Sequence, residues 1–482
     1  MKTPIIDPLL NMIFKNNPVR VLSFFIILIF ITKPLFTQNS NPNTAPPNYL
    51  NIANTITDTA MLNGKAYSLL RELCYDIGQR LCGSPQAAAA VEWSRQTMMK
   101  LDLENVQLQP VMVPHWERGK IAEAAIINSS ILGTVPLSIC ALGGSIGTAE
   151  LGIIAEVIEV PGLKEAASLG KNAQGKIVFY NRPMNPKTMN TFAGYGGAVD
   201  QRTLGAIEAA KVGAVAVLVR AVTTRLDKVP HTGLMQYDET VPQIPAAAIS
   251  TVDAELLSKL IKQERNVRVQ LRLDCMSYPD IESGNVIGEI TGTEKPEEVI
   301  VIGGHLDSWD VGHGAHDDGA GCIQSIEALR LIKILGLKPK RTIRAVMFMC
   351  EEFGIYGGPA YADSVKKSGP KHIAAIESDR GGFTPRGFGV SADSHIVAKI
   401  KKWEYLFKEM DAANIFQGGG GPDISPLNEL GTATIGLIVD YHRYFDYHHS
   451  SNDVFEAVNE RELELGAAAM AILAYVLAME GI

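Results

Sequence analysis

The sequence has 482 residues, of which 46% are hydrophobic and 20% are charged, and its formal net charge is −8. This length is greater than that of one ordinary domain, so about two or three folded units are expected. The acidic balance and the lack of a long Lys/Arg run exclude a nucleic-acid-binding protein, because phosphate binding requires a basic face. Peptides or small molecules are the expected ligands.

The N-terminal segment predicts export. Lys15 and Arg20 precede the apolar run VLSFFIILIFIT at residues 21–32, and small and polar residues follow it. A helix needs roughly 20 residues to cross a bilayer, so this run is too short for a membrane anchor. The pattern indicates a signal peptide over residues 1–38. We therefore expect a secreted or periplasmic protein with no stable membrane span after cleavage.

The cysteines give little sign of a disulfide framework. Six cysteines are sparse for an exported chain of this length, and none forms a CxxC pair. Cys322 and Cys350 lie in apolar patterns, where a buried thiol is the ordinary interpretation. Only Cys74 and Cys82 are close enough in sequence to suggest a disulfide.

The first folded part is expected over residues 53–115. The segment 39–52 is rich in Asn and Pro and is interpreted as a linker. Ser84 and Pro85 form a cap and first-turn pair, which predicts a helix over AAAAVEWSRQTMMKL. The alternation in VQLQPVMVP then predicts a strand.

The middle of the chain, residues 116–282, is interpreted as an inserted domain. Short apolar runs such as GIIAEVIEV and GKIVFY predict strands, and a helix is expected over residues 253–261. In TLGAIEAAKVGAVAVLV, Gly213 is expected to end a helix before a strand begins. No cluster of His, Cys and carboxylate side chains occurs here, so we expect this segment to contribute no chemistry of its own.

Residues 283–482 alternate between strands and helices. Continuous apolar runs such as VIVIGG, TIRAVMFMC and ATIGLIVD are typical of strands that are covered on both faces. The predicted fold is therefore α/β, with a mixed, largely parallel sheet sandwiched by helices. The expected helices are 319–335, 361–367, 394–410 and 461–479.

Metal-seeking side chains follow the ends of these predicted strands. Carboxyl ends of parallel strands meet at one edge of a sheet, where ligands usually bind. Two neighbouring divalent cations need His nitrogens and several carboxylates, one of them bridging. The pattern therefore predicts a metal site. The strand-end residues are His305, Asp307, Asp317, Glu351, Glu352, Asp379, His448 and His449.

Two spacings suggest separate roles within this set. His305 and Asp307 point to the same side of an extended segment, so the Asp307 carboxylate is expected to accept the second ring N–H of His305 and fix its tautomer. Glu351 and Glu352 are adjacent and must lie where the strand ends and the chain turns. One can then bind metal while the other accepts a proton from the attacking water.

The chain resembles the zinc-dependent exopeptidases of the bacterial leucyl aminopeptidase and glutamate carboxypeptidase type, and most closely their plasma glutamate carboxypeptidase branch. The resemblance covers nearly all of the expected mature chain, and the middle segment resembles a protease-associated β/α domain. The motifs that carry it are GSPQAAAAVEW, VQLQPVMVPHWERG, GGHLDSWDVGHGAHDDGAG, EEFGIYGG, ESDRGG, GGPDISPL and YFDYHHSSNDVF.

The resemblance implies two Zn²⁺ per chain, and it suggests a homodimer. Asp317 would bridge the two ions, and Glu351 would be the general base. His449 is selected over His448 because the family's ligand precedes Ser or Thr. One zinc would be held by His305 and Asp379, and the other by Glu352 and His449.

Several acidic and histidine side chains have simpler interpretations. Asp310 and Asp318 are better explained as helix caps or loop charges than as ligands. His448 either lines the substrate pocket or caps it. The glycines at 418–421 form a turn, and the alternative is that they let Asp423 meet the amino group of a substrate.

The predicted function is a metallo-exopeptidase that releases N-terminal residues from dipeptides or short peptides. A carboxypeptidase that releases residues such as glutamate is the first alternative. A non-catalytic, receptor-like relative and a single-zinc glutaminyl cyclase are the others. The GGSIG stretch at 143–147 matches the serine-hydrolase pattern, but a strand pattern follows it where that motif requires a helix.

Overall fold

The computed structural model describes residues 48–482. The predicted signal peptide and most of the predicted linker lie outside these residues. Helix α1 (Tyr49–Asn63) begins inside the predicted linker, so that prediction is wrong at its C-terminal end. The side chain of Asn48 accepts a hydrogen bond from the Asn51 N–H and caps the helix, which therefore starts earlier than the apolar spacing alone suggested.

The first sheet has eight strands in the order β1-β10-β12-β11-β13-β16-β14-β15. Strands β12, β11, β13 and β16 are parallel to one another, whereas β10 and β14 pair antiparallel with this group. The mixed, largely parallel sheet is therefore confirmed. The bounds are β1 (Glu104–Glu117), β10 (Met276–Ile290), β11 (Lys295–His305), β12 (Arg341–Phe348), β13 (Lys371–Glu377), β14 (Pro385–Ser391), β15 (Asn414–Gln417) and β16 (Ala433–Val439).

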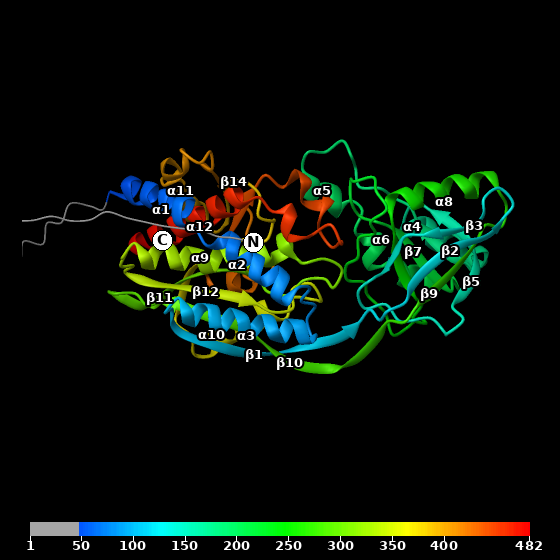
Figure 1. Cartoon of the computed structure of the whole chain (residues 1–482), viewed down its shortest axis with the longest axis horizontal. Coiled ribbons are helices and arrows are strands. Elements are labelled where there is room, and N and C mark those ends of the chain that lie inside the picture. Colours follow the sequence, from blue (N-terminus) through cyan, green and yellow to red (C-terminus); the bar gives the residue numbers. More distant parts are fainter. Residues whose placement is uncertain (1–47) are drawn as a thin grey trace, which may run out of the picture. The chain divides into compact units, whose positions relative to one another are not determined.

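Helices cover both faces of this sheet (Figure 1). Along β11, Ile300 and Ile302 belong to one buried cluster and Val299 and Val301 to another, as expected for a strand whose side chains alternate between two covered faces. The first cluster includes α9 and α12, and the second includes α10. The helices of this part are α1, α2 (Ala66–Glu72), α3 (Pro85–Lys100), α9 (Ala320–Ile334), α10 (Gly357–Ser368), α11 (Ser394–Lys401) and α12 (Glu460–Glu480).

Helix α12 is a core helix. Among residues 48–482 it is the one helix that is long and apolar enough to cross a membrane, and 89% of its most apolar window is buried inside the fold. Its apolar composition is explained by packing against α1, α9 and the sheet.

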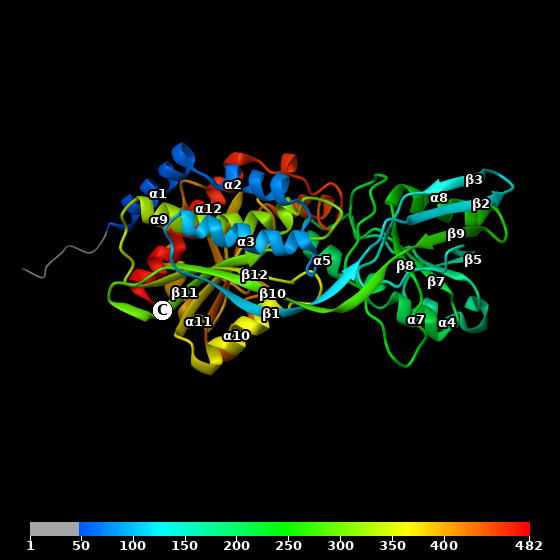
Figure 2. The same ribbon diagram turned by 60° about the horizontal axis from the view of Figure 1, so that its bottom comes forward.

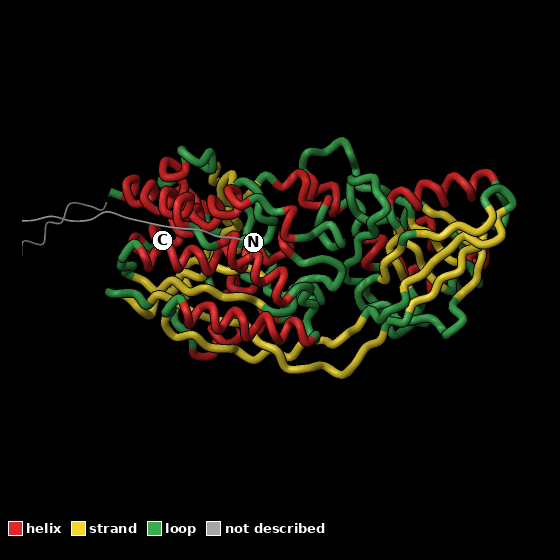
Figure 3. Tube along the Cα trace, in the orientation of Figure 1, coloured by secondary structure: helices red, strands yellow, loops and turns green. Residues whose placement is uncertain are grey.

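A second eight-stranded sheet is built entirely from residues between 122 and 273, in the order β3-β2-β9-β5-β6-β7-β8-β4. Strands β1 and β10 leave the first sheet as a paired antiparallel ribbon that runs toward this second sheet (Figures 2 and 3). Its protease-associated character stays a prediction. The strands are β2 (Ala122–Ser129), β3 (Gly133–Leu137), β4 (Ile139–Ala141), β5 (Ile153–Val160), β6 (Ile177–Tyr180), β7 (Ala216–Arg220), β8 (Ala246–Ile249) and β9 (Arg268–Leu273). The helices are α4 (Leu163–Ser168), α5 (Thr191–Gly196), α6 (Asp200–Thr203), α7 (Gly205–Lys211) and α8 (Thr251–Gln263).

Local signals in the sequence were mostly correct. Ser84 caps α3 by accepting from the Ala87 N–H, and Gly213 has a φ of +79° between α7 and β7, as its role at a helix end requires. The predicted helix 394–410 is wrong in length. Helix α11 ends at Lys401 because the N–H groups of Lys402 and Trp403 bond three residues back, which tightens the chain into 3₁₀ turns.

The suggested Cys74–Cys82 disulfide is wrong, because Cys82 Sγ faces Cys350 Sγ at 2.7 Å instead. All six cysteines are buried, and this structure joins no two of them by a disulfide.

Arg80 ties the N-terminal segment to the loop that follows β11. It is fully buried, and its guanidinium donates hydrogen bonds to the carbonyl oxygens of Leu306, His313 and Gly314. Its backbone also exchanges hydrogen bonds with Ser308. A single cation therefore satisfies the backbone acceptors of this long loop, which would otherwise be buried without partners.

We predict that Arg80→Met lowers the free energy of unfolding by about 3 kcal/mol or more, because the loop carbonyls lose their donors while they remain buried. Chemical denaturation measures the loss. Arg95→Met is the matched control, since this partly exposed residue of α3 pairs only with Glu92 and should cost less than about 1 kcal/mol. Equal losses in the two variants would contradict this role of Arg80.

Candidate metal centre

The predicted strand-end side chains meet at one edge of the first sheet. His305 is the last residue of β11, Glu351 and Glu352 follow β12, and Asp379 follows β13. His449 lies in the segment after β16. Since β11, β12, β13 and β16 are parallel, all these residues leave the sheet at the same edge, where ligands of such sheets bind.

Asp317 lies between two groups of side chains. Its Oδ1 is 3.3 Å from His305 Nε2, which is also 3.5 Å from Asp379 Oδ1. Its Oδ2 is 3.5 Å from His449 Nε2, which in turn is 2.8 Å from Glu352 Oε2. Each oxygen of Asp317 therefore faces one histidine, and each of these histidines also faces one further carboxylate. This is the arrangement expected of a carboxylate that bridges two cations.

Hydrogen bonds at the opposite ring nitrogens leave both Nε2 atoms pointing at Asp317. His305 Nδ1 is 3.0 Å from the backbone oxygen of Asp307, and His449 Nδ1 is 3.3 Å from the backbone oxygen of Thr232. An Nδ1–H that donates to such a carbonyl leaves a lone pair on Nε2 for a cation. At His449, Arg202 Nη1 also lies 3.4 Å from Nδ1.

The predicted contact between His305 and the Asp307 carboxylate is wrong. The carboxylate oxygen lies 3.8 Å from Nδ1, and the backbone oxygen of the same residue accepts instead. The reason is that the Asp307 carboxylate is already occupied. Oδ1 accepts from the N–H groups of Cys350 and Glu351, and Oδ2 accepts from that of Glu352.

These three hydrogen bonds shape the turn after β12. Cys350 has a φ of +68°, which breaks the strand immediately before Glu351. The break allows the adjacent Glu351 and Glu352 to reach the same cavity, as the sequence required. Asp307, which the sequence predicted to support catalysis by orienting His305, instead positions the two glutamates through their backbone N–H groups.

Two further carboxylates hold the backbone around Asp317. Asp453 accepts from the N–H groups of His316 and Asp317, and Asp318 accepts from those of His305 and Gly321. The bond to Gly321 supports the interpretation of Asp318 as a cap at the start of α9, although the side chain is fully buried rather than solvated. Asp310 pairs with Arg118, as expected of a loop charge.

The concentration of buried carboxylates calls for positive charge. Asp317 is 4% exposed and Glu352 is 6% exposed, yet Asp317 Oδ2 and Glu352 Oε1 have no hydrogen-bond partner among residues 48–482. Burial and the neighbouring Asp317 raise the pKa of Glu352 well above its usual range. Buried charges are ordinarily paired or coordinate metals, so these residues fit a site for divalent cations.

Glu351 differs from its neighbour. No hydrogen bond to its carboxylate occurs within residues 48–482, and the side chain lines a cavity of about 310 Å³. Burial, together with Asp379 and Asp307 and against the opposing effect of His305, raises its pKa to about 8. A cavity-facing carboxylate with a raised pKa is suited to accept and return a proton.

Residues of the middle segment also form walls of this cavity, from α5, α6 and the loop between β7 and β8. The sequence contained no sign of this contribution, because these side chains form no recognisable motif. The cavity is lined by Phe192, Tyr195, Arg202, Leu234, Asp317, Glu351, Glu352, Gly354, Ile355, Asp379, Tyr444, Phe445, His448 and His449.

Arg202 is the basic member of this lining. It is 6% exposed, and it donates hydrogen bonds to Tyr195 Oη at 2.6 Å and to the backbone oxygen of Thr232 at 3.2 Å. Its Nε has no hydrogen-bond partner, and no carboxylate of residues 48–482 forms an ion pair with it. Gly233, with a φ of +136°, leaves room for the guanidinium that a Cβ would block.

The remaining candidates lie around this core. The rings of His448 and His449 stack with centroids 3.4 Å apart, and His448 Nε2 is 3.9 Å from Asp317 Oδ2, so His448 lines the cavity as one of its two interpretations required. Asp423 is 1% exposed, and neither carboxylate oxygen has a partner. It does not line the cavity, and its contact with a substrate amine stays a prediction.

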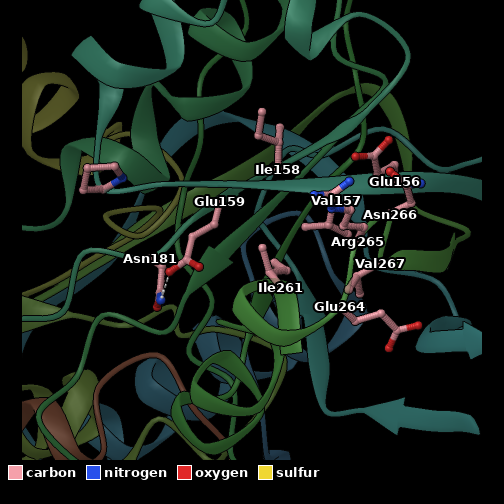
Figure 4. A pocket seen from close by; sticks show the side chains of 11 residues that line it. Glu156, Val157, Ile158, Glu159, Asn181, Ile261, Glu264, Arg265, Asn266 and Val267 are labelled. Carbon is pink, nitrogen blue, oxygen red and sulfur yellow. Dashed lines mark hydrogen bonds between the residues drawn. The ribbon is translucent and has the colours of Figure 1, made fainter. Parts of the chain in front are cut away.

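Another cavity, of about 570 Å³, lies at the second sheet and shares no lining residue with this cluster; Figure 4 shows the side chains that line it. Its acidic side chains already have partners. Glu159 accepts from Asn181, Glu156 pairs with Lys176, and Glu264 accepts from Ser129 and Ser130. These contacts leave none of its three carboxylates without a partner.

The chain is similar to known peptidases. The model of peptidase family M28 matches residues 285–476. Carboxypeptidase Q from Bos taurus is 39% identical over 418 residues, which covers 86% of this chain and 85% of the relative.

Solved structures share the fold. The crystal structure of a peptidase M28 precursor from Shewanella amazonensis aligns with a TM-score of 0.85 and 34% identity, over 90% of this chain and 97% of that one. A zinc aminopeptidase from Bacillus subtilis aligns with a TM-score of 0.62 and 20% identity, over 86% of this chain and 95% of that one. Their mixed α/β architecture matches the first sheet and its helices.

We predict that the metal-free protein loses stability as the pH rises from about 5 to about 8. The folded-state pKa is about 8 for Glu351 and about 7 for Asp453, above the values of 4.5 and 3.8 for exposed groups, so the folded state binds more protons in this range. Urea denaturation across this range, with chelator and with added Zn²⁺, measures the effect. Cations bound at the site should weaken the dependence of the free energy of unfolding on pH. The same pH dependence with chelator and with Zn²⁺ would contradict the proposal of a metal site here.

Proposed function

Because the chain belongs to the carboxypeptidase Q branch of peptidase family M28, we propose that it is a zinc exopeptidase that hydrolyses dipeptides or short peptides from their N-terminal end. The observation that carries the proposal is the meeting of five metal-seeking side chains, four of them around Asp317, with Glu351 facing the same cavity. Retention of all five argues against a non-catalytic relative.

The proposed metal ligands form two sets that share Asp317. His305 and Asp379 would hold one zinc, and Glu352 and His449 would hold the other. A glutaminyl cyclase would need only one ion. Zinc bound there would supply Lewis-acid activation of the attacking water and of the scissile carbonyl. Measuring two zinc ions per chain would support this assignment over the single-zinc alternative.

Glu351 is the proposed general base. Its ionised carboxylate accepts a proton from the attacking water and passes it to the nitrogen of the leaving amine, so the side chain ends each cycle in its starting state. The Asp307 carboxylate keeps the Glu351 backbone in place during this transfer, because it accepts the Glu351 N–H at 3.0 Å.

Arg202 is the proposed partner of the substrate carboxylate. A buried guanidinium without an anionic partner is costly, and a carboxylate matches its planar donors. The same cavity carries the acidic side chains of Asp379 and Glu351. A substrate with a free amine and a free carboxylate therefore matches the charges on the cavity walls.

The size of the cavity supports a short substrate. Its volume of about 310 Å³ lies near the lower end of the range for small-molecule sites, roughly 300–1,000 Å³. A dipeptide is the smallest peptide that carries both termini. We therefore favour dipeptidase or aminopeptidase action over a carboxypeptidase that acts on longer chains, and we propose that the enzyme is exported by its N-terminal signal.

We predict that Glu351→Gln lowers kcat at least about a hundredfold and leaves the zinc content unchanged, because the amide cannot accept the proton. Steady-state kinetics and metal analysis of the same preparation measure both quantities. Near-normal turnover would rule out Glu351 as the base, whereas loss of zinc would show that it is a ligand.

We predict that Arg202→Gln raises the KM for a free dipeptide about tenfold or more and changes the KM for its C-terminal amide little, because only the free acid offers the guanidinium a charged partner. Steady-state kinetics of Arg202→Gln with the two substrates separate recognition of the carboxylate from an effect on folding. An equal rise in KM for both substrates would indicate that Arg202 has a structural role.

The matched control is Arg182→Gln. Arg182 follows β6, is more exposed than Arg202 and pairs with Asp200, so this substitution should leave both KM values unchanged. The N-acetylated dipeptide completes the substrate panel. The proposed aminopeptidase or dipeptidase requires a free amine and should not cleave it. A carboxypeptidase would.

A further inference from the structure

Cys82 and Cys350 form the closest pair of thiols within residues 48–482. Cys350 Sγ lies 2.7 Å from Cys82 Sγ, whereas non-bonded heavy atoms ordinarily stay about 3.5 Å or more apart. Cys350 is 0% exposed and Cys82 is 1% exposed. The two residues are separated by 268 positions in the sequence, so only the folded chain brings them together.

The surroundings favour a covalent link over a metal. The Asp307 carboxylate is the third metal-seeking group near these thiols. Both of its oxygens already accept backbone N–H groups from the turn at Cys350, which leaves it poorly placed to hold an ion as well. Apolar side chains of the main buried cluster enclose both cysteines.

We propose that Cys82 and Cys350 form a disulfide in the exported protein, beside the candidate metal centre. The proposal depends on export and not on the peptidase activity. The chemistry is a two-electron exchange with a protein disulfide of an extracytoplasmic thiol oxidase. One S–S bond forms between Cys82 and Cys350, the oxidant's S–S bond breaks, and the two thiol protons and two electrons pass to the oxidant's sulfurs.

Such a bond would fasten the turn that carries Glu351 to the N-terminal segment. Cys82 lies two residues after Arg80, whose guanidinium bonds the loop after β11. Cys350 immediately precedes Glu351. Residues 80–82 would then hold both the loop after β11, through the hydrogen bonds of Arg80, and the turn after β12, through the disulfide of Cys82. A cross-link that closes a long loop restricts the unfolded chain and stabilises the fold.

The test counts thiols in the exported protein, purified without reductant, unfolded in denaturant and treated with an alkylating agent. All six cysteines are within the described residues, so the proposal expects four alkylated cysteines. Intact mass should rise to six alkylations only after reduction. A digest without reductant should yield one peptide pair that joins Cys82 to Cys350. Six reactive thiols, or a different pairing, would overturn the proposal.

Two variants make the count specific. In Cys82→Ala, Cys350 has no disulfide partner and is a free thiol, so all five remaining cysteines should be alkylated. Cys74→Ala removes an equally buried thiol and keeps the disulfide, so three cysteines should be alkylated. Cys82→Ala should also lower the Tm on the order of 5 °C, and this loss should vanish when both proteins are compared after reduction. Alkylation needs no folded protein, so the count remains decisive if a variant folds poorly.

Discussion

The geometry of the metal centre depends on one carboxylate and three backbone N–H groups. Asp307 follows β11, yet its oxygens accept hydrogen bonds from the residues that follow β12. Side chains of adjacent residues on a regular strand point to opposite faces, so Glu351 and Glu352 could not both serve one cavity without the turn that these bonds hold. The Asp307 carboxylate, in the loop after β11, therefore fixes the directions of the Glu351 and Glu352 side chains, which follow the neighbouring strand β12.

The same device recurs at the other loops. Asp318 bonds the His305 backbone, and Asp453, from the C-terminal part of the chain, bonds the backbone next to and at Asp317. In each case a buried carboxylate orders the backbone at or next to a proposed metal ligand. The residues behind the site, Asp307, Asp318 and Asp453, are therefore acidic like the site itself. Hydrogen bonds from backbone N–H groups, rather than basic side chains, stabilise these buried carboxylates.

The fold and the strand-end residues were predictable because their signals are local. Apolar runs mark the parallel strands, and sheet geometry brings their ends together. Asp307 was misjudged because spacing cannot show whether the carbonyl or the carboxylate of a residue reaches a histidine. Arg80 and Arg202 were missed because their roles depend on how distant segments pack. Neither arginine stands in a motif, and burial without an anionic partner can only be recognised once the chain is folded.

The contacts of His231 and Thr232 bear on how the chain can be divided. The Thr232 N–H donates to the His449 carbonyl at 2.9 Å, and His231 Nδ1 lies 2.8 Å from the His448 carbonyl. A chimera that exchanged the second sheet for that of a relative would have to preserve this short stretch, or the histidine pair would lose its backbone support. The two sheets are therefore not interchangeable modules, and grafting should follow the contacts rather than the sheet boundaries.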